Sequence, residues 1–318
     1  MKSILNKIKK IDIPLSENFD PNKFSDTDTL LYQLNSDLFE NNKINHKDRV
    51  HALNRLRNLL ISEKFDFLIA HNLVLTGKVE QELGNIKNAI KKSTDSYKLF
   101  NTMHQTNQLA VNGSIFAYSN LANIYSNLNL NNISLDYLYK SQKVIELCEN
   151  TYIPKIRINL NLGICYHALK KYQKSLKYLN EIYDLAFEKN DYTVLIPIIV
   201  NISSVYFSMG KYDKCFELNK KALKFLDKID DVNYRPAILN DLAIYYKINN
   251  DLKKALSLFQ EALDINIKIS AYNKIPNSYN NIADTLVDLK KYEKATSYYK
   301  LTIKNSKNEE HLKSKIHA

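Results

Sequence analysis

The chain has 318 residues, of which 45% are hydrophobic, so it is long enough to bury a substantial core. Its 5 glycines and 6 prolines are too few for the many turns of a β-sandwich or for a glycine-rich nucleotide-binding loop, so the composition predicts an all-α protein. The net charge of +11 comes mainly from lysines spread over the C-terminal half, whereas nucleic-acid readers concentrate arginine in one stripe, which argues against a nucleic-acid partner.

The first 70 residues show little repetition. Residues 1–25 form an N-terminal extension that is basic, contains Pro14 and lacks an apolar run of signal-peptide length. We expect residues 26–70 to form a degenerate helical hairpin. The arginines of this segment would suit a DNA-reading helix, but the same segment fits a repeat helix, and we favour the repeat.

From residue 71 to residue 307 the chain repeats a unit of about 40 residues, which we interpret as an array of about six repeats. The five clear copies start at Asn120, Asn161, Asn201, Asp241 and Asn281, at intervals of 41, 40, 40 and 40 residues. Such a period is typical of solenoids, in which one supersecondary unit is stacked many times. The polar residues 308–318 would then be a tail or a cap.

Each copy places a small residue at the same point of a first helix and again twelve residues later in a second helix. Large residues follow at helical spacing on the same face, and a short turn such as Gly210–Lys211 separates the two helices. The small residues would let the paired helices approach closely. They are Ala122, Gly163, Ser203, Ala243 and Ala283 in the first helices, and Ser134, Ser175, Cys215, Ala255 and Ala295 in the second.

Prolines keep the same period. Pro154, Pro197, Pro236 and Pro276 lie six to nine residues before the small residue of their copies. We therefore expect each of them at the beginning of a first helix, where proline is tolerated best.

These columns resemble the tetratricopeptide repeat, a helix-turn-helix unit with the same small–large–small pattern. The resemblance implies a right-handed superhelical solenoid of stacked antiparallel helix pairs, whose first helices line a concave face that binds partners. The 40-residue period exceeds the usual 34 and is similar to that of bacterial signalling proteins, namely peptide-sensing regulators and proteins with a tetratricopeptide sensor ahead of an output domain.

In the resembled family, the residue before the apolar column points into the concave groove. An amide offers both donors and an acceptor, so a ladder of amides could pair with a peptide backbone; the alternative is that these side chains only cap local structure or face water. The column consists of Asn120, Asn161, Asn201, Asp241 and Asn281, with Asn240 and Asn280 as neighbours.

Two further side chains are candidate partner contacts. Arg157 lies four residues before Asn161, on the same helical face, where it could bind a carboxylate. His167 follows Tyr166, should face the groove and would serve recognition or packing rather than catalysis. The lysine that precedes the asparagine column in chaperone-binding tetratricopeptide domains is missing, so that carboxylate clamp is not expected.

No motif of a hydrolase, nucleotide-binding enzyme or metal site is present, so we expect neither catalysis nor a metal or other cofactor. The three cysteines form no CxxC and suggest small buried side chains in a reducing, cytoplasmic compartment. No stretch reaches the length of a membrane span. The sequence does not predict an oligomeric state.

The hypothesis that follows is a non-catalytic scaffold or sensor that holds a protein or peptide in its groove. One alternative is a peptide-pheromone-type regulator that acts on a signalling protein or on DNA. Another is the tetratricopeptide sensory region of a larger signalling enzyme, with the catalytic domain outside this chain.

Overall fold

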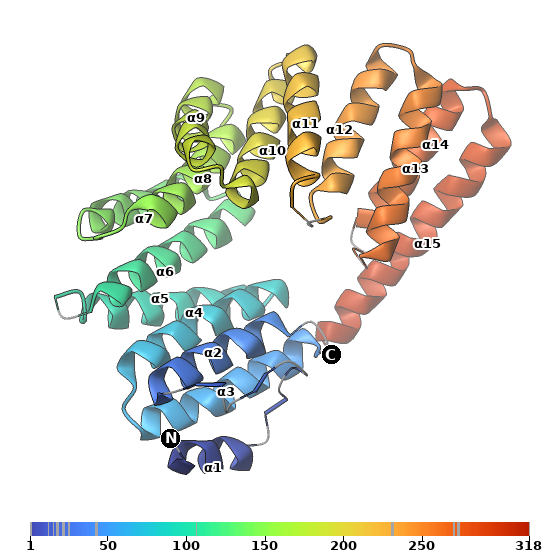
Figure 1. Cartoon of the computed structure of the whole chain (residues 1–318). Coiled ribbons are helices and arrows are strands. Elements are labelled where there is room, and N and C mark those ends of the chain that lie inside the picture. The colour runs from blue at the N-terminus through green and yellow to red at the C-terminus, as the bar shows by residue number, and fades with distance from the viewer. Residues whose placement is uncertain are drawn as a thin grey trace. The chain divides into compact units, whose positions relative to one another are not determined.

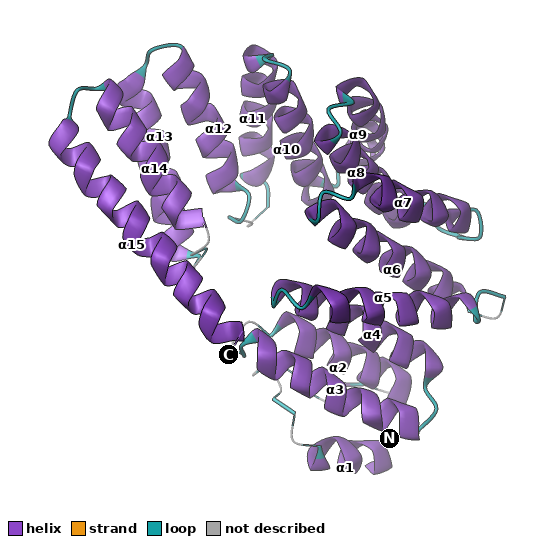
Figure 2. Cartoon of the chain, turned by 180° about the vertical axis from the view of Figure 1, so that it is seen from behind, coloured by secondary structure: helices purple, strands orange, loops and turns teal. Residues whose placement is uncertain are grey.

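A computed structural model of the chain describes residues 2–317 except 12, 15, 17–18, 21–22, 25, 42–43, 106, 230–231, 270 and 272–273, and leaves the side chains of residues 2, 5 and 306–317 undescribed. Within the described residues all regular structure is helical (Figure 2), which confirms the predicted all-α class.

Fifteen helices follow one another in the described chain (Figure 1). They are α1 (Lys2–Lys10), α2 (Thr27–Glu40), α3 (His46–Ser62), α4 (Asp66–Glu82), α5 (Ile86–Asn101), α6 (Gln108–Asn127), α7 (Asn131–Ile145), α8 (Tyr152–Ala168), α9 (Tyr172–Glu188), α10 (Tyr192–Ser208), α11 (Tyr212–Leu226), α12 (Arg235–Ile248), α13 (Leu252–Lys268), α14 (Ile275–Asp288) and α15 (Tyr292–His317).

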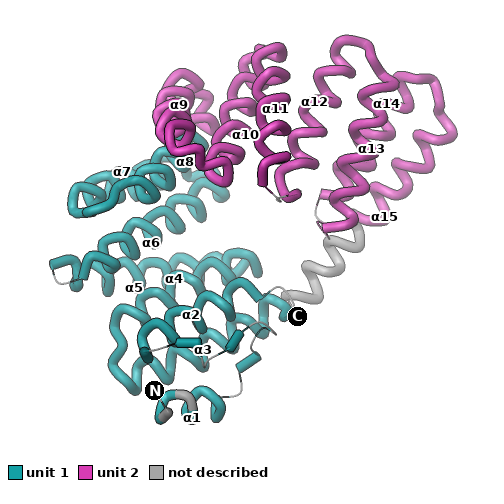
Figure 3. Tube along the Cα trace, viewed as in Figure 1, with its two compact units in different colours: residues 1–165 teal, residues 166–318 magenta. Residues whose placement is uncertain are grey.

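The helices form two compact units, residues 1–165 and residues 166–318, with the boundary inside α8 (Figure 3). In the first unit α2 pairs with α3, α4 with α5 and α6 with α7, and α2 and α6 both contact α4, so the first helices of successive hairpins are neighbours. In the second unit each helix from α9 to α15 packs on the next. The stacked helix pairs of the predicted solenoid are therefore present.

The N-terminal segments join this stack. The expected hairpin of residues 26–70 corresponds to α2 and α3, and residue 70 lies inside α4, which begins at Asp66. Helix α1 packs on α3 and buries Ile4 and Ile8 in the core of the first unit. At the other end, the backbone of the predicted tail continues α15 as far as His317.

The small residues of the repeat lie where helices meet, as predicted. All ten are buried, and the apolar column that precedes them in the first helices is buried as well. Gly77 shows the reason in the copy upstream of the clear ones, because a Cβ on this residue of α4 would lie 2.7 Å from the hydroxyl of Ser93 on α5. Each larger side chain in this column would push two helices apart.

The turns inside the hairpins also keep the period. One residue of each turn has a positive φ, and its neighbours close the helix end with backbone hydrogen bonds, such as Lys170 N to His167 O and Lys171 N to Tyr166 O. The residues with positive φ in the turns between a first and a second helix are Gly84, Asn129, Lys170, Gly210, Asn250 and Lys290.

The prolines follow the prediction except for one. Pro236 and Pro276 stand at the second position of α12 and α14, and Pro154 lies in the first turn of α8. The prediction for Pro197 is wrong, because this residue lies inside α10. Asp191 caps that helix by accepting a hydrogen bond from the backbone of Val194, and an apolar run after the cap extends α10 beyond the proline.

Candidate functional site

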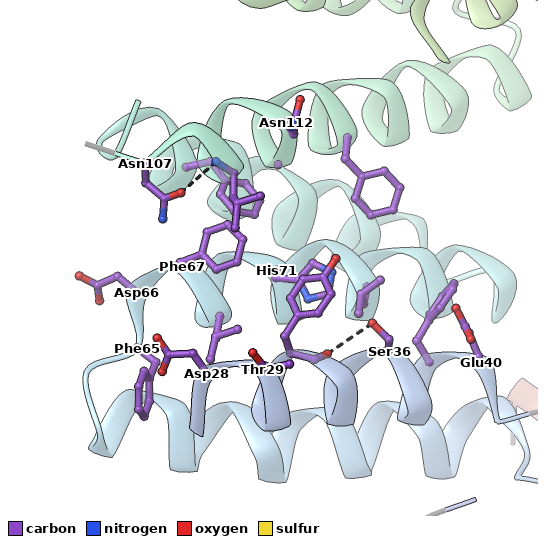
Figure 4. Close-up of a pocket in the computed structure, with 18 of the residues that line it drawn as sticks. Asp28, Thr29, Ser36, Glu40, Phe65, Asp66, Phe67, His71, Asn107 and Asn112 are labelled. Atoms are coloured by element: carbon purple, nitrogen blue, oxygen red, sulfur yellow. Dashed lines mark hydrogen bonds between the residues drawn. The ribbon is translucent and has the colours of Figure 1, made fainter. Parts of the chain in front are cut away.

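A cavity of about 930 Å³ lies in the first unit (Figure 4). Three first helices, α2, α4 and α6, supply most of its lining, and α5 and α8 add one side chain each. Along each first helix the lining residues recur every three or four positions and so share one face. They include Asp28, Tyr32, Ser36 and Phe39 on α2, Phe67, His71 and Leu75 on α4, and Leu109, Asn112 and Phe116 on α6.

Aromatic rings form one wall of the cavity. The ring of Tyr32 stacks on that of His71 with 4.5 Å between the ring centroids. The ring of Phe67 meets that of Phe100 edge-on at 5.7 Å. Gly113 makes room for Phe100, because a Cβ at this glycine would lie 2.5 Å from the ring.

His71 points into the middle of the cavity (Figure 4). Burial lowers the pKa of its imidazole from 6.5 to about 4, so the ring is neutral at physiological pH. Its Nδ1 atom is buried and has no hydrogen-bond partner among the described residues. A buried polar atom without a partner is costly, and a bound ligand could satisfy it.

Charged side chains also line the cavity. Asp28 and Asp66 lie at one end, next to Asn107, whose side chain caps α6 by accepting from two backbone N–H groups (Figure 4). Glu40 lies at the opposite end and is exposed. Arg157 of α8 also lines the cavity, and its guanidinium carbon lies 4.5 Å from the centroid of the Phe116 ring.

Lys78 of α4 also lies close to the ring of Phe116. Its Nζ is 5.2 Å from the centroid of Phe116 and 5.0 Å from that of Phe39. Burial, and then the charge of Arg157, lowers the pKa of Lys78, while Glu82 raises it. Burial also lowers the pKa of Arg157.

In the first unit the amide column is only partly open to a partner. Asn120 is buried and donates a hydrogen bond of 2.7 Å from its Nδ2 to Ser93 Oγ, which links α6 to α5. A partner could reach this amide only if that bond broke. Asn161 on α8 is half-buried.

In the second unit two column residues are engaged by the protein itself. Asn201 donates to the carbonyl oxygen of Pro197 in its own helix at 2.7 Å. Asp241 accepts a hydrogen bond of 3.2 Å from Asn219, and burial raises the pKa of its carboxyl from 3.8 to about 6. The neighbouring Asn240 has a buried Oδ1 atom without a partner among the described residues.

Asn281 lines a second cavity, of about 670 Å³, within the second unit. The neighbouring Asn280 is exposed and donates to Asp284, which also accepts from Tyr299 at 2.5 Å. Lys247 and Asp288 both line this cavity and form an ion pair of 3.0 Å. The polar groups of this cavity are thus largely paired with one another.

His167 lies apart from both cavities. Its Nε2 is 2.8 Å from the hydroxyl of Ser208 on α10, and its ring lies 5.9 Å from that of Tyr172. Burial lowers the pKa of the imidazole. The structure therefore brings only Arg157 of the predicted residues to the cavity of the first unit.

Sequence analysis missed the column that lines this cavity. His71, Phe116 and Arg157 each lie six residues before the small residue of their repeat, namely Gly77, Ala122 and Gly163. The column is one helical turn before the asparagine column and on the same face. Arg157 was noticed because it is charged, and the same offset applied to the other repeats would have found the remaining two.

Two other kinds of site were sought in the described part of the chain. No group of three or more histidine, cysteine, aspartate or glutamate side chains there could hold a metal ion. No helix of that part is long and apolar enough to cross a bilayer.

The comparisons with known proteins agree with the repeat. Family models of the tetratricopeptide repeat match residues 156–189, 195–268 and 276–308. No curated protein sequence matched the chain.

Three solved structures illustrate the likeness in fold. A Rap protein complexed with competence and sporulation factor has a TM-score of 0.67 at 15% identity, over 96% of this chain and 80% of that one. The apo form of RapI has a TM-score of 0.66 at 14% identity, over 89% of this chain and 98% of that one. The third is a signal transduction ATPase with numerous domains and a tetratricopeptide repeat sensor, from Pyrococcus horikoshii. It has a TM-score of 0.65 at 15% identity, over 92% of this chain and 42% of that one.

The repeat columns, the paired helices and the family matches lead to one assignment. Residues 156–189, 195–268 and 276–308 carry tetratricopeptide repeats, and the fold of the chain is similar to that of the Rap proteins.

Proposed function

We propose that the protein is a non-catalytic sensor or scaffold that binds a peptide or a segment of another protein. The observation that carries the proposal is the cavity of the first unit, which three successive first helices line with aromatic rings together with polar and charged side chains. Concave, mostly apolar sites with a small number of polar groups are the usual form of ligand sites.

The fold supports the same class of function. Tetratricopeptide arrays present surfaces for partners, and one similar structure is of a Rap protein complexed with competence and sporulation factor. A peptide sensor is therefore the form of the proposal that we favour. The three free cysteines fit a reducing compartment, and we place the protein in the cytoplasm on that ground.

The amide column stays in the proposal as a second, weaker contact surface. Asn161 is half-buried, and Asn281 lines the cavity of the second unit. Asn120 and Asp241 are left out, because their side chains bond to Ser93 and Asn219.

The test is affinity selection of peptides from a random synthetic library, read by mass spectrometry. We compare the wild type with the double variant Tyr32→Ala/Leu109→Ala, which alters two exposed lining residues and so spares the core. Tyr292→Ala is the matched control, because this tyrosine is exposed at the start of α15.

We expect the wild type and the control to retain a common set of peptides that the double variant loses. Recovery of the same set by a folded double variant would contradict the assignment of the cavity. A wild type that retains no peptide would contradict the proposed function itself.

A further inference from the structure

Two cations and one aromatic ring form a cluster next to the cavity in the first unit. Lys78 and Arg157 both lie within 6 Å of the centroid of Phe116, the range of a cation–π interaction. Phe116 and Arg157 line the cavity, and Lys78 follows the lining residues His71 and Leu75 of α4 by seven and three residues, so it lies on the same face of that helix.

Neither cation has a carboxylate partner at ion-pair distance in the described part of the chain, although the more distant charge of Glu82 raises the pKa of Lys78. Within the described residues no carboxylate oxygen lies within 4.0 Å of Lys78 or Arg157, whereas Lys7, Arg235 and Lys247 each have such a partner. The charges of Lys78 and Arg157 repel each other, and burial weakens the solvation of both. Two partly buried like charges are costly unless an anion joins them.

The side chains that line the rest of the cavity indicate the chemistry of the ligand that carries the anionic group. The aromatic wall of Tyr32, Phe67 and Phe100 borders the cavity, and the imidazole of His71, which stacks on Tyr32, lines it too. A ligand that fills the cavity therefore needs an apolar, preferably aromatic body and one anionic group.

We propose that Lys78 and Arg157, which both contact the ring of Phe116, form the subsite for the anionic group of an aromatic or otherwise apolar ligand. The group is a carboxylate or a chemically similar anion, and it comes either from a small aromatic acid or from the C-terminal residue of a peptide. The inference rests on the proposed function, and it names the part of the ligand that the cavity recognises.

Glu40 provides an internal check. It lines the cavity, is exposed and follows Phe39, whose ring centroid lies 5.0 Å from Lys78 Nζ, so its charge opposes a bound anion without neutralising either cation. Its replacement by glutamine should strengthen binding of an anion, while a purely apolar site would not respond.

The experiment uses two fluorescent probes of nearly the same shape. 8-Anilinonaphthalene-1-sulfonate carries an anionic group, and N-phenyl-1-naphthylamine lacks it. Titrations use the wild type, Lys78→Gln, Arg157→Gln, Glu40→Gln and the control Lys140→Gln, whose Nζ lies 4.7 Å from the ring of Tyr137, outside the cavity.

We expect Lys78→Gln and Arg157→Gln each to weaken sulfonate binding by about tenfold, the loss of one charge-assisted contact. We expect Glu40→Gln to strengthen it about twofold to threefold, as removal of one exposed like charge would. The affinity for the neutral probe should be the same in all of these variants. Lys140→Gln should bind both probes as tightly as the wild type does.

Competition then separates the two sources of the anion. The tripeptide acetyl-Ala-Ala-Phe with a free carboxylate, its C-terminal amide and 3-phenylpropionate each compete with the sulfonate probe. Stronger competition by the free tripeptide indicates a peptide C-terminus, and equal or stronger competition by 3-phenylpropionate indicates a small acid; either result supports the subsite.

The inference is overturned if the amide competes as well as the free acid, or if both probes bind equally to the wild type and to the lysine and arginine variants. If the anion subsite fails in this way but Tyr32→Ala/Leu109→Ala no longer binds the neutral probe, the result would still support a binding cavity. The failure of the anion subsite is thereby distinguished from the failure of the proposed function.

Discussion

At the scale of the single residue, two unusual residues of successive repeats account for each other: Asn219 in the column of large apolar residues and Asp241 in the amide column. Asn219 stands where the other repeats place a large apolar side chain, and it is fully buried. Its Nδ2 donates to Ser203 Oγ at 2.9 Å and to Asp241 Oδ2 at 3.2 Å. The buried amide and the carboxylate that replaces asparagine in the amide column thus form one polar cluster.

Asp241→Asn should stabilise the protein at neutral pH. Burial raises the pKa of the Asp241 carboxyl from 3.8 to about 6. The folded state therefore binds more protons than the unfolded state between these values, and stability falls as pH rises through this window. Urea titrations should show the variant to be more stable at pH 7.5 by roughly 2 kcal/mol, a value discounted for partial exposure.

The same titrations at pH 3.5 should show a much smaller difference, because the carboxyl is then largely protonated in both states. The exposed Asp264→Asn serves as the control. A constant difference between Asp241→Asn and wild type from pH 3.5 to pH 7.5 would contradict the assignment.

At the scale of the element, the hairpin turns combine a fixed geometry with variable residues. Gly84 and Gly210 have positive φ, and the equivalent positions in other repeats hold asparagine or lysine. A side chain with a Cβ adopts this conformation at a cost of about 1 kcal/mol, which glycine avoids. The lysine turns therefore carry a small strain.

Lys290→Gly and Gly210→Ala should change stability in opposite directions. Lys290 has a φ of 61°, so glycine should stabilise the turn between α14 and α15 by about 0.5–1 kcal/mol. Gly210 has a φ of 71°, and a Cβ there would meet nothing within 4 Å, so alanine should cost about 1 kcal/mol through the backbone alone. Thermal and urea unfolding measure both; a shift of the same sign in the two variants would contradict the explanation.

At the scale of the whole molecule, the contacts described run mainly between helices that follow each other in the chain. Stability in such a stack is approximately the sum of local terms and nearest-neighbour terms. A defect in one unit should then be felt most strongly in that unit.

Asn72→Ala tests this locality. Asn72 is fully buried on α4 and donates to Asn35 Oδ1 at 2.8 Å and to the carbonyl oxygen of Leu53 at 2.9 Å, so it joins α2, α3 and α4. Its loss leaves both acceptors without this donor and should cost roughly 2–3 kcal/mol. Hydrogen exchange read by mass spectrometry should show faster exchange in residues 27–82 and unchanged exchange in residues 212–268.

The exposed Asn123→Ala, also in the first unit, is the control and should leave both regions unchanged. Equal acceleration of exchange in both regions by Asn72→Ala would indicate that the two units unfold together.

Sequence periodicity by itself determined the helix pairs, the buried small columns and the turns. These features are local, since a small residue and a turn with positive φ are required within each 40-residue unit whatever its neighbours are. The exception was Pro197, because the cap at Asp191 lies upstream of the position that the period indicates.

Only the tertiary structure decided which polar side chains are open to a ligand. Asn120 and Asp241 fit the amide column by spacing, yet Ser93 and Asn219 on neighbouring helices engage them. Conversely, Lys78 and Arg157 come from different repeats, and the fold brings both of them to the ring of Phe116. The physical reason is that helical spacing specifies the face of a helix, whereas burial and pairing depend on the side chains that the next helices bring to that face.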